Sequence, residues 1–197
     1  LLKSVYTTRE LGALGLKPKE YILTVGRLLP VKGIHYLIPA YRRVKTTMPL
    51  IIVGAPAESG YLEHLKSLAK GDARIRFVGY KIGQALDELF AHSYLFCQPS
   101  IAEGLPLAVL EAMSFGVPVL VSDVQGNVEA IHRSGFTFES ENIDDLKDQL
   151  EYLVNNREEA RAAGMSGRKI IDLFFNWDKI AEKTERVYQL AKRRHVK

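Results

Sequence analysis

Two basic side chains bracket a turn that follows the first apolar run of the chain. Arg27 and Lys32 lie in GRLLPVKG, the stretch from Gly26 to Gly33. A guanidinium can bind two phosphate oxygens at once, an ammonium acts as a point charge, and both could reach one anion. Gly26 would let the backbone leave the strand at an unusual angle or approach a ligand closely. The stretch could therefore bind an anion, although two surface bases flanking a loop would give the same pattern.

A second stretch with the chemistry for anion binding is PSIAEGLPLAVLEA. Pro106 suits the first position of a helix, because its φ is fixed and it has no amide proton to leave unpaired. The amides of Gly104, Leu105 and Leu107 would then lie at the positive end of that helix, which binds phosphate or carboxylate groups. Glu103 precedes the helix, and the same dipole would favour it there even without a ligand.

Glu111 is the only charged residue between Glu103 and Asp123. The predicted helix around it has no polar stripe, which indicates a helix buried on all sides. An unpaired buried carboxylate costs several kcal/mol, so it needs donors or takes up a proton. We therefore expect Glu111 to face a crevice and to accept hydrogen bonds from ligand hydroxyls, such as the adjacent pair of a ribose. The alternative is a core glutamate satisfied by backbone amides or by a buried arginine.

The composition argues against several other kinds of site. The five histidines are scattered without the spacing of metal ligands, so we expect no metal site. The single cysteine, Cys97, leaves no internal disulfide, and a reducing compartment is compatible with it. Gly116 and Pro118 interrupt the most apolar run, so no membrane span is expected. The net charge of +4 lies partly in the terminal KRRHVK, which could attract nucleotides or an anionic membrane surface, or form a solvated helix end.

The elements that must position these residues alternate between strands and helices. Short apolar runs predict strands at Tyr21–Val25, Leu50–Val53, Arg74–Gly79, Tyr94–Cys97, Val117–Val121 and Gly135–Phe138. Helical spacing predicts helices at 33–47, 62–68, Ile82–Ala91, Pro106–Phe115, Val124–Arg133, Ile143–Asn155, Glu158–Phe174 and Trp177–Arg194. This alternation is typical of an α/β fold, a doubly wound, Rossmann-like parallel sheet of about six strands. The first twenty residues are expected to be a connecting segment.

In a doubly wound sheet the ligand crevice lies beyond the carboxyl ends of the strands. That rule selects the turns at 26–32, 54–60, 79–82, 98–106 and 122–126. Both candidate stretches are among them, so we expect the chemistry at this edge of the sheet. Neither stretch has the Gly-x-x-x-x-Gly-Lys-Ser/Thr pattern of a P-loop or the Gly-x-Gly-x-x-Gly dinucleotide fingerprint.

These stretches together resemble glycosyltransferase family 4, the group 1 family of retaining enzymes with the GT-B fold. VGRLLPVKG resembles the first strand and phosphate-binding turn of that family. PSIAEGLPLAVLEAMSFGVPVLVSD resembles its acidic signature, two glutamates with seven residues between them, and RFVGY resembles the strand and turn beside the nucleobase. The likeness runs from about Arg9 to Trp177. It implies that residues 1–197 form one donor-binding domain with C-terminal helices, the C-terminal half of a GT-B fold whose N-terminal acceptor domain is absent from this chain.

The resemblance also implies roles for single residues. Arg27 and Lys32 would hold the donor diphosphate and stabilise the charge that develops on the leaving nucleotide, without a metal. Glu103 would lie by the donor sugar, and Glu111 would bind the ribose hydroxyls. Gly79, Tyr80 and Lys81 would lie against the base. The other donor-binding positions would be Gly26, Gly104, Leu105, Pro106 and Leu107.

The implied function is retaining transfer of a hexosyl group from a UDP-, GDP- or ADP-linked sugar to a saccharide, lipid or other acceptor. No cofactor and no nucleic acid are expected, and the location would be the cytoplasm or the inner face of a membrane. The acceptor would bind through the N-terminal domain, so this chain alone is expected to be inactive. Two alternatives are a non-catalytic, nucleotide-binding regulatory module and another GT-B enzyme such as a nucleotide-sugar epimerase. A receiver-like domain would need aspartates where Gly26 and Arg27 stand.

Overall fold

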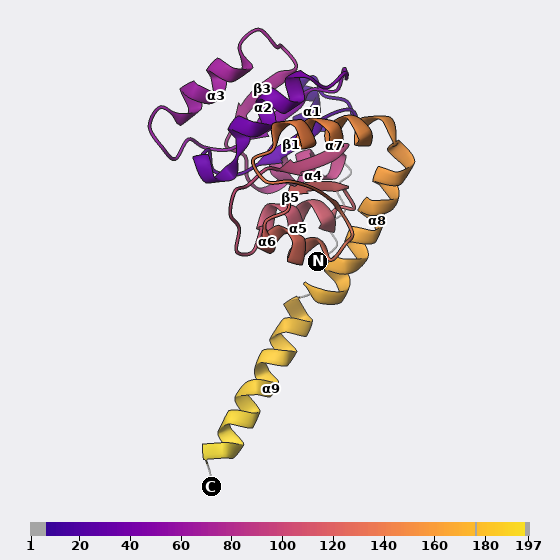
Figure 1. The fold of residues 1–197 in the computed structure, drawn as a ribbon. Helices are drawn as coiled ribbons and strands as arrows, with labels where there is room; N and C mark the ends of the chain where they lie inside the picture. The colour runs from indigo at the N-terminus through magenta and orange to yellow at the C-terminus, as the bar shows by residue number, and fades with distance from the viewer. Residues whose placement is uncertain (1–6, 176, 196–197) are drawn as a thin grey trace.

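The computed structural model describes residues 7–175 and 177–195 and contains a six-stranded parallel sheet (Figure 1). The strand order is β3-β2-β1-β4-β5-β6, and every neighbouring pair is parallel. The strands are β1 Ile22–Val25, β2 Leu50–Val53, β3 Ile75–Gly79, β4 Leu95–Gln98, β5 Val119–Ser122 and β6 Phe136–Phe138. The predicted α/β, doubly wound, Rossmann-like fold is confirmed, and each predicted strand lies within two residues of an observed one.

The helices are α1 Arg9–Leu14, α2 Ile34–Arg42, α3 Tyr61–Ala69, α4 Gly83–His92, α5 Leu107–Ser114, α6 Gln125–Ile131, α7 Ile143–Asn155, α8 Arg157–Phe174 and α9 Trp177–His195. A short 3₁₀ helix, Pro30–Lys32, lies in the turn after β1. Helix α2 ends five residues before the predicted end at 47. The prediction was too long because Val44, which lies beyond the helix, is a buried apolar residue at helical spacing from those of α2.

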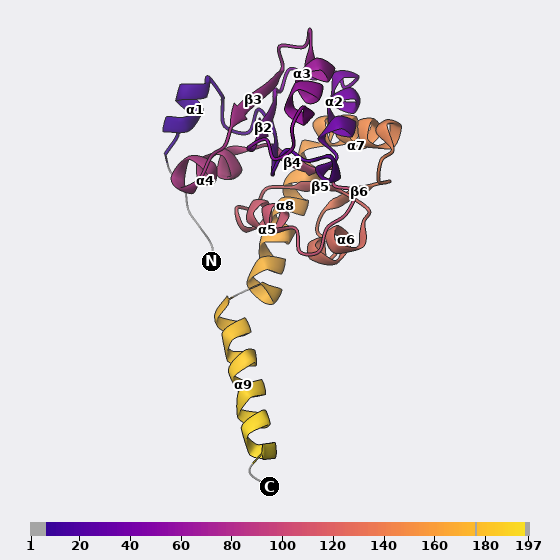
Figure 2. The ribbon, with the colours of Figure 1, turned by 90° about the vertical axis from the view of Figure 1, so that its left-hand side faces the viewer.

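The sheet is covered on both faces, as the continuous apolar runs of its strands predict. Successive strand residues point to opposite faces, so Ile22 packs in one core cluster and Leu23 in the other. Helices α2, α3 and α7 lie on the first side, whereas α1 and α4 lie on the second (Figure 2). On that second side the core also includes Val109 and Met113 of α5 and Ile171 of α8.

Helix α1 corrects the expectation that the first twenty residues only connect to the sheet. Glu88 of α4 is buried and accepts hydrogen bonds from the amides of Arg9 and Glu10 at 3.2 and 2.6 Å, and from the Thr7 hydroxyl. Burial would raise the pKa of Glu88, but these hydrogen bonds hold it below its usual value. The helix is thus capped by a residue far away in sequence, while Leu11 packs in the core.

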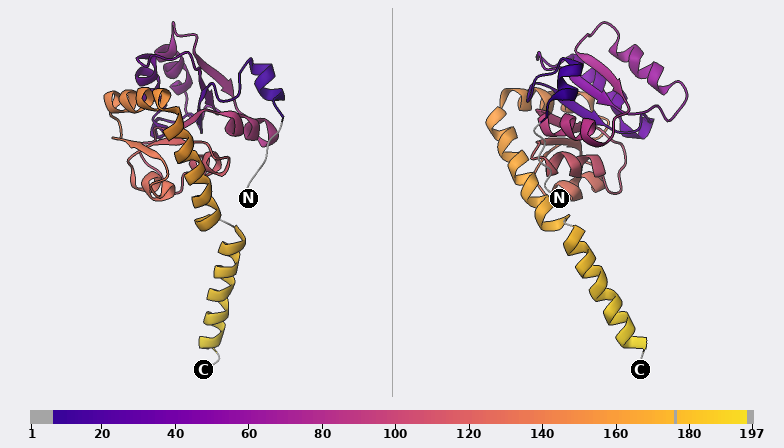
Figure 3. Two further views of the ribbon diagram at one scale, coloured as in Figure 1. Left: turned by 90° about the vertical axis from the view of Figure 1, so that its right-hand side faces the viewer. Right: turned by 180° about the vertical axis from the view of Figure 1, so that it is seen from behind.

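The C-terminal helices differ in how they meet the sheet. Helix α8 runs along the body of the domain, whereas α9 leads away from it (Figure 3). The side chains from Lys179 to Lys192 are exposed. Of the basic terminal stretch, Val196 and Lys197 lie outside the described residues. In the described part of the chain no helix combines the length and hydropathy needed to cross a bilayer.

Candidate functional site

The crevice expected of a doubly wound sheet falls between β1 and β4, where the strand order reverses. The turn after β1 and the loop after β4 meet there. The Ile101 amide donates to the Val31 carbonyl at 2.8 Å. Gly33 has a φ of 66°, and a Cβ at that position would lie 1.7 Å from the Pro99 carbonyl oxygen. Only glycine permits so close an approach of the two segments, which fixes their relative position.

Lys32 and Glu103 form the centre of this junction. The Lys32 Nζ lies 2.6 Å from Glu103 Oε1, and the Gln98 amide and Ser100 hydroxyl donate to the same oxygen at 2.7 Å. The side chain of Glu103 is 8% exposed and that of Lys32 is 26% exposed. No donor within the described residues binds Glu103 Oε2. The carboxylate is therefore held through one oxygen and has the other available.

The loop that carries Glu103 is also fixed from the turn after β5. A Cβ on Gly126 would lie 2.3 Å from the Glu103 carbonyl oxygen and 2.5 Å from that of Gly104. Below this contact, the Ser122 hydroxyl donates to the Ser100 carbonyl, and the Asn127 amide donates to Ser122. Backbone and side chains therefore hold the Glu103 loop on two sides.

The sequence reasoning did not identify Gln98, Ser100, Ser122 or Asn127 as parts of this site. All four are buried polar residues. Gln98 and Ser122 are the last residues of β4 and β5, where the apolar runs end. A polar side chain at the carboxyl end of a buried parallel strand is a usable signal, because that is the edge at which the crevice forms.

Helix α5 differs from its prediction in two ways. It begins at Leu107, with Pro106 as the N-cap residue, one position later than expected. More importantly, it is not buried on all sides, because Leu107 is 63% exposed and Glu111 is also exposed. The buried side consists of Val109, Ala112 and Met113. The expectation of a buried Glu111 is wrong, and so is the alternative of a core glutamate. Apolar side chains on the open face of the helix produced the error.

Arg27 and Gly26 also lie at this edge, directly after β1. The Arg27 side chain is exposed, and no hydrogen bond or ion pair joins it to another described residue. Gly26 has no positive φ, so the unusual backbone angle expected there is absent. Gly26 lies against Gly54, since a Cβ on Gly54 would lie 1.9 Å from the Gly26 carbonyl oxygen.

The turn after β3 contains Gly79, Tyr80 and Lys81. Gly79 has a φ of 74°, and Tyr80 is 69% exposed. Lys81 forms an ion pair with Glu10 at 2.6 Å. A cavity of about 280 Å³ lies beside the turn. Its lining comes from α3 (Leu62 and Lys66) and from the ends of β1, β2 and β3 with the turns that follow them, including Leu28, Gly54, Pro56, Phe77, Gly79 and Tyr80.

The candidate site therefore combines a fixed acid–base pair, an exposed arginine and a small cavity farther along the carboxyl edge of the sheet. The Glu103 carboxylate accepts no amide hydrogen bond from the start of α5, so it does not act as a cap of that helix. Across the described residues no group of three or more histidine, cysteine, aspartate or glutamate side chains could hold a metal ion. The arrangement can bind an anion at Lys32 and accept hydrogen bonds at Glu103.

Comparisons with known proteins agree on one family. A family model described as glycosyl transferases group 1 matches residues 9–170. An uncharacterised glycosyltransferase of Methanocaldococcus jannaschii is 32% identical over 187 residues, which are 88% of this chain and 45% of that protein. A GDP-mannose-dependent α-(1-6)-phosphatidylinositol monomannoside mannosyltransferase of Mycobacterium tuberculosis is 32% identical over 185 residues, 86% of this chain and 47% of that protein.

A solved structure shows the same fold. HepE of Anabaena, in complex with UDP and glucose, has a TM-score of 0.82 and 21% identity over 92% of this chain and 50% of that one. The chain spans about half the length of the curated relatives it matches.

Proposed function

This chain belongs to the group 1 glycosyl transferases, and on that premise we propose that it is the donor-binding half of a retaining glycosyltransferase of family 4. Its donor would be a nucleotide-diphosphate sugar, and the reaction would transfer a hexosyl group without a metal or other cofactor. The observation that carries the proposal is the Lys32–Glu103 pair at the switch point of the sheet, with Glu103 Oε1 bound by three donors. This geometry places an ammonium and a fixed carboxylate side by side in the crevice.

Lys32 has two further protons on Nζ besides the one that it gives to Glu103. We propose that these bind oxygens of the donor diphosphate and stabilise the charge on the nucleotide as it leaves. Arg27 follows β1 in the same turn, and its exposed guanidinium would bind a second pair of oxygens. The amides of Gly104, Leu105 and Leu107 would contact the diphosphate or the sugar, with Pro106 setting the start of α5.

Glu103 would act on the sugar through Oε2. Oε1 already accepts hydrogen bonds from three donors. Oε2 would therefore be the oxygen that accepts hydrogen bonds from a ligand. Hydrogen bonds from sugar hydroxyls to a fixed carboxylate would strengthen as positive charge develops on the ring. Glu111 would bind the ribose hydroxyls from the exposed face of α5, where its carboxylate is not desolvated beforehand. Gly26 would line the same crevice, and Gly79, Tyr80 and Lys81 would contact the base.

The remainder of the enzyme would supply the acceptor site. The curated relatives are about twice as long as this chain, and we propose that an N-terminal domain closes over the crevice and binds a glycan or lipid acceptor. Leu105, Leu107 and Ile82 are exposed beside the crevice, which fits a surface that donor and second domain cover. The location proposed is the cytoplasm, with peripheral contact to the membrane. Alone, this chain would bind donor weakly and transfer nothing.

A ligand screen on this chain tests the proposal. The chain would be heated with UDP, GDP, ADP and their sugars, since a ligand that binds only the folded state raises the melting temperature. One of the three nucleotide series should raise it, and Lys32→Ala should abolish the rise. Lys70→Ala, at the far end of α3, serves as the control. If no nucleotide moves the melting temperature of the folded chain, the donor-site proposal fails.

A further inference from the structure

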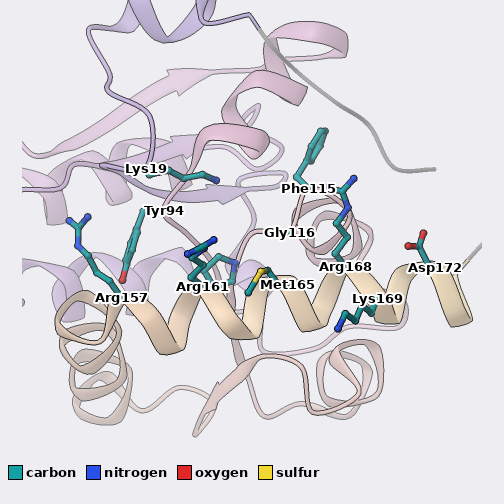
Figure 4. A pocket seen from close by; sticks show the side chains of 11 residues that line it. Lys19, Tyr94, Phe115, Gly116, Arg157, Arg161, Met165, Arg168, Lys169 and Asp172 are labelled. Atoms are coloured by element: carbon teal, nitrogen blue, oxygen red, sulfur yellow. The ribbon is translucent and has the colours of Figure 1, made fainter.

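A basic groove runs along α8 on the edge of the sheet opposite to the crevice. Tyr94 and Pro118 directly precede β4 and β5, so the groove lies at the amino ends of these strands. Its volume is about 670 Å³, within the range of small-molecule sites (Figure 4).

The close packing of α8 on the sheet builds this groove. A Cβ on Gly164 would lie 2.3 Å from the Gly116 carbonyl oxygen and 2.9 Å from the Pro118 nitrogen. The helix backbone therefore touches the turn between α5 and β5. Arg161, Met165 and Arg168 follow one another at helical spacing and form one wall beside that contact (Figure 4).

The charges of the wall are almost all positive. Arg161, Arg168 and Lys169 form no ion pair with any carboxylate in the part of the chain that the structure describes. Arg157 lies over the ring of Tyr94, 5.1 Å from its centroid. Lys19 has another role, because its Nζ donates to the Ala91 and Ser93 carbonyls at 2.8 and 3.0 Å. Asp172 is the only acidic residue of the lining, and it stands at one end. Such a field favours an anionic ligand.

The groove is not only charged. Phe115, Pro118 and Met165 contribute apolar surface between the cations, and Met165 is 51% exposed. Arg161 and Arg168, about two helical turns apart on α8, present planar guanidinium groups that match phosphate oxygens. A ligand that uses the whole groove would combine a phosphate with an apolar organic part.

We propose that this groove binds a phosphate ester with an apolar organic moiety, separate from the nucleotide-sugar donor. Arg161 and Arg168 would bind the phosphate, and Met165 and Phe115 would contact the apolar part. Such an ester can be a phospholipid at a bilayer surface or a soluble molecule, and both have the same recognition chemistry. The inference does not depend on the proposed donor site, which lies at the other edge of the sheet.

The proposal is tested by calorimetric titration of the chain with dihexanoyl phosphatidic acid below its micellar concentration. Inorganic phosphate is titrated for comparison. The lipid should bind more tightly than inorganic phosphate. Arg161→Ala/Arg168→Ala should weaken it by at least about tenfold, because each charged hydrogen bond contributes at least that much. Lys183→Ala/Arg186→Ala on α9 removes the same charge elsewhere and should change nothing. A melting curve of each variant verifies that it is folded.

Cosedimentation with phosphatidylglycerol and phosphatidylcholine vesicles then identifies the source. If the chain binds the anionic vesicles and the Arg161→Ala/Arg168→Ala variant does not, the ligand of the groove is a bilayer lipid. Lipid monomer binding without vesicle binding assigns it to a soluble ester, and either result supports the proposal. The proposal is overturned if the lipid monomer does not bind, if it binds no better than inorganic phosphate, or if the α9 variant weakens binding as much as the groove variant.

Discussion

Lys32 Nζ lies 2.6 Å from Glu103 Oε1, so a base from the turn after β1 and an acid from the loop after β4 pair across the switch point. The pair joins two segments that are 71 residues apart. Glu103 is nearly buried, and a buried carboxylate is costly unless it keeps its donors. The same contact therefore stabilises the junction of the two segments and, in our proposal, positions the two groups that meet the donor.

Removing the base should reveal both roles. Lys32→Met leaves the Glu103 carboxylate with the neutral donors of Gln98 and Ser100, and should lower the free energy of unfolding by about 1–3 kcal/mol. Glu103→Gln on top of it removes the unpaired charge, so the double variant should be more stable than the sum of the two single changes, by about 1 kcal/mol. Urea denaturation measures this coupling. Additive effects would show that the pair does not interact in solution.

The carboxylate itself should matter more for turnover than for donor binding. In the full-length protein, Glu103→Gln keeps the side-chain shape but loses the charge, and kcat should fall by about 100-fold or more, as for other groups that stabilise transition-state charge. The dissociation constant of the nucleoside diphosphate should change by less than about threefold, since the diphosphate binds Lys32 and Arg27 in our proposal. Glu63→Gln on the exposed face of α3 is the matched control. Full turnover by the Glu103 variant contradicts the proposed role.

Glu111 permits a separate test. Because its side chain is exposed, a substitution can change nucleotide binding with little effect on the stability of the fold. Glu111→Ala should change the free energy of unfolding by no more than about 0.5 kcal/mol. If Glu111 binds the ribose, the wild-type chain should prefer a ribonucleoside diphosphate over its 2′-deoxy form, and the variant should lose that preference. Calorimetric titration with the two nucleotides measures it. An unchanged preference in the variant would move the ribose contact to another residue.

The sheet was predictable because its strands carry a strong physical signal. Leu50–Val53 was predicted with the right bounds, since four apolar residues between Pro49 and Gly54 suit a strand buried on both faces. Arg27, Lys32 and Glu103 were placed at the correct edge for the same reason, as the crevice lies beyond strand ends. The rule about strand ends predicts only where these three residues lie in the fold. Their roles in donor binding and catalysis stay predictions.

Long-range contacts explain what the sequence could not predict. Helix α1 is capped by Glu88, which is distant in sequence, so no local pattern marked its start. Glu111 was misplaced because a pattern of apolar residues shows what a helix can bury, not which face the fold covers. The hydrogen bonds from Gln98 and Ser100 to Glu103 depend on how one loop bends, which residue types alone do not specify.

Gly126 offers a test of whether the Glu103 loop must be held in place. A Cβ there would lie 2.3 and 2.5 Å from the carbonyl oxygens of Glu103 and Gly104, and because both are backbone atoms, the loop has to move. Gly126→Ala should lower the free energy of unfolding by about 1–3 kcal/mol. Donor affinity should fall as well, even where the protein is fully folded, because the shifted loop displaces the Gly104 and Leu105 amides that contact the diphosphate in our proposal.

Gly12→Ala separates this effect from the general cost of adding a methyl group. Gly12 lies in α1 and has no positive φ. A Cβ at Gly12 would meet no neighbouring atom within 4 Å. Alanine should therefore stabilise the chain there by about 0.5–1 kcal/mol, through the lower entropy of the unfolded state. Melting curves with and without the nucleoside diphosphate compare the two variants. If Gly126→Ala melts and binds donor like the wild type, the loop is not fixed by that contact, and the position of Glu103 must depend on Lys32, Gln98 and Ser100 alone.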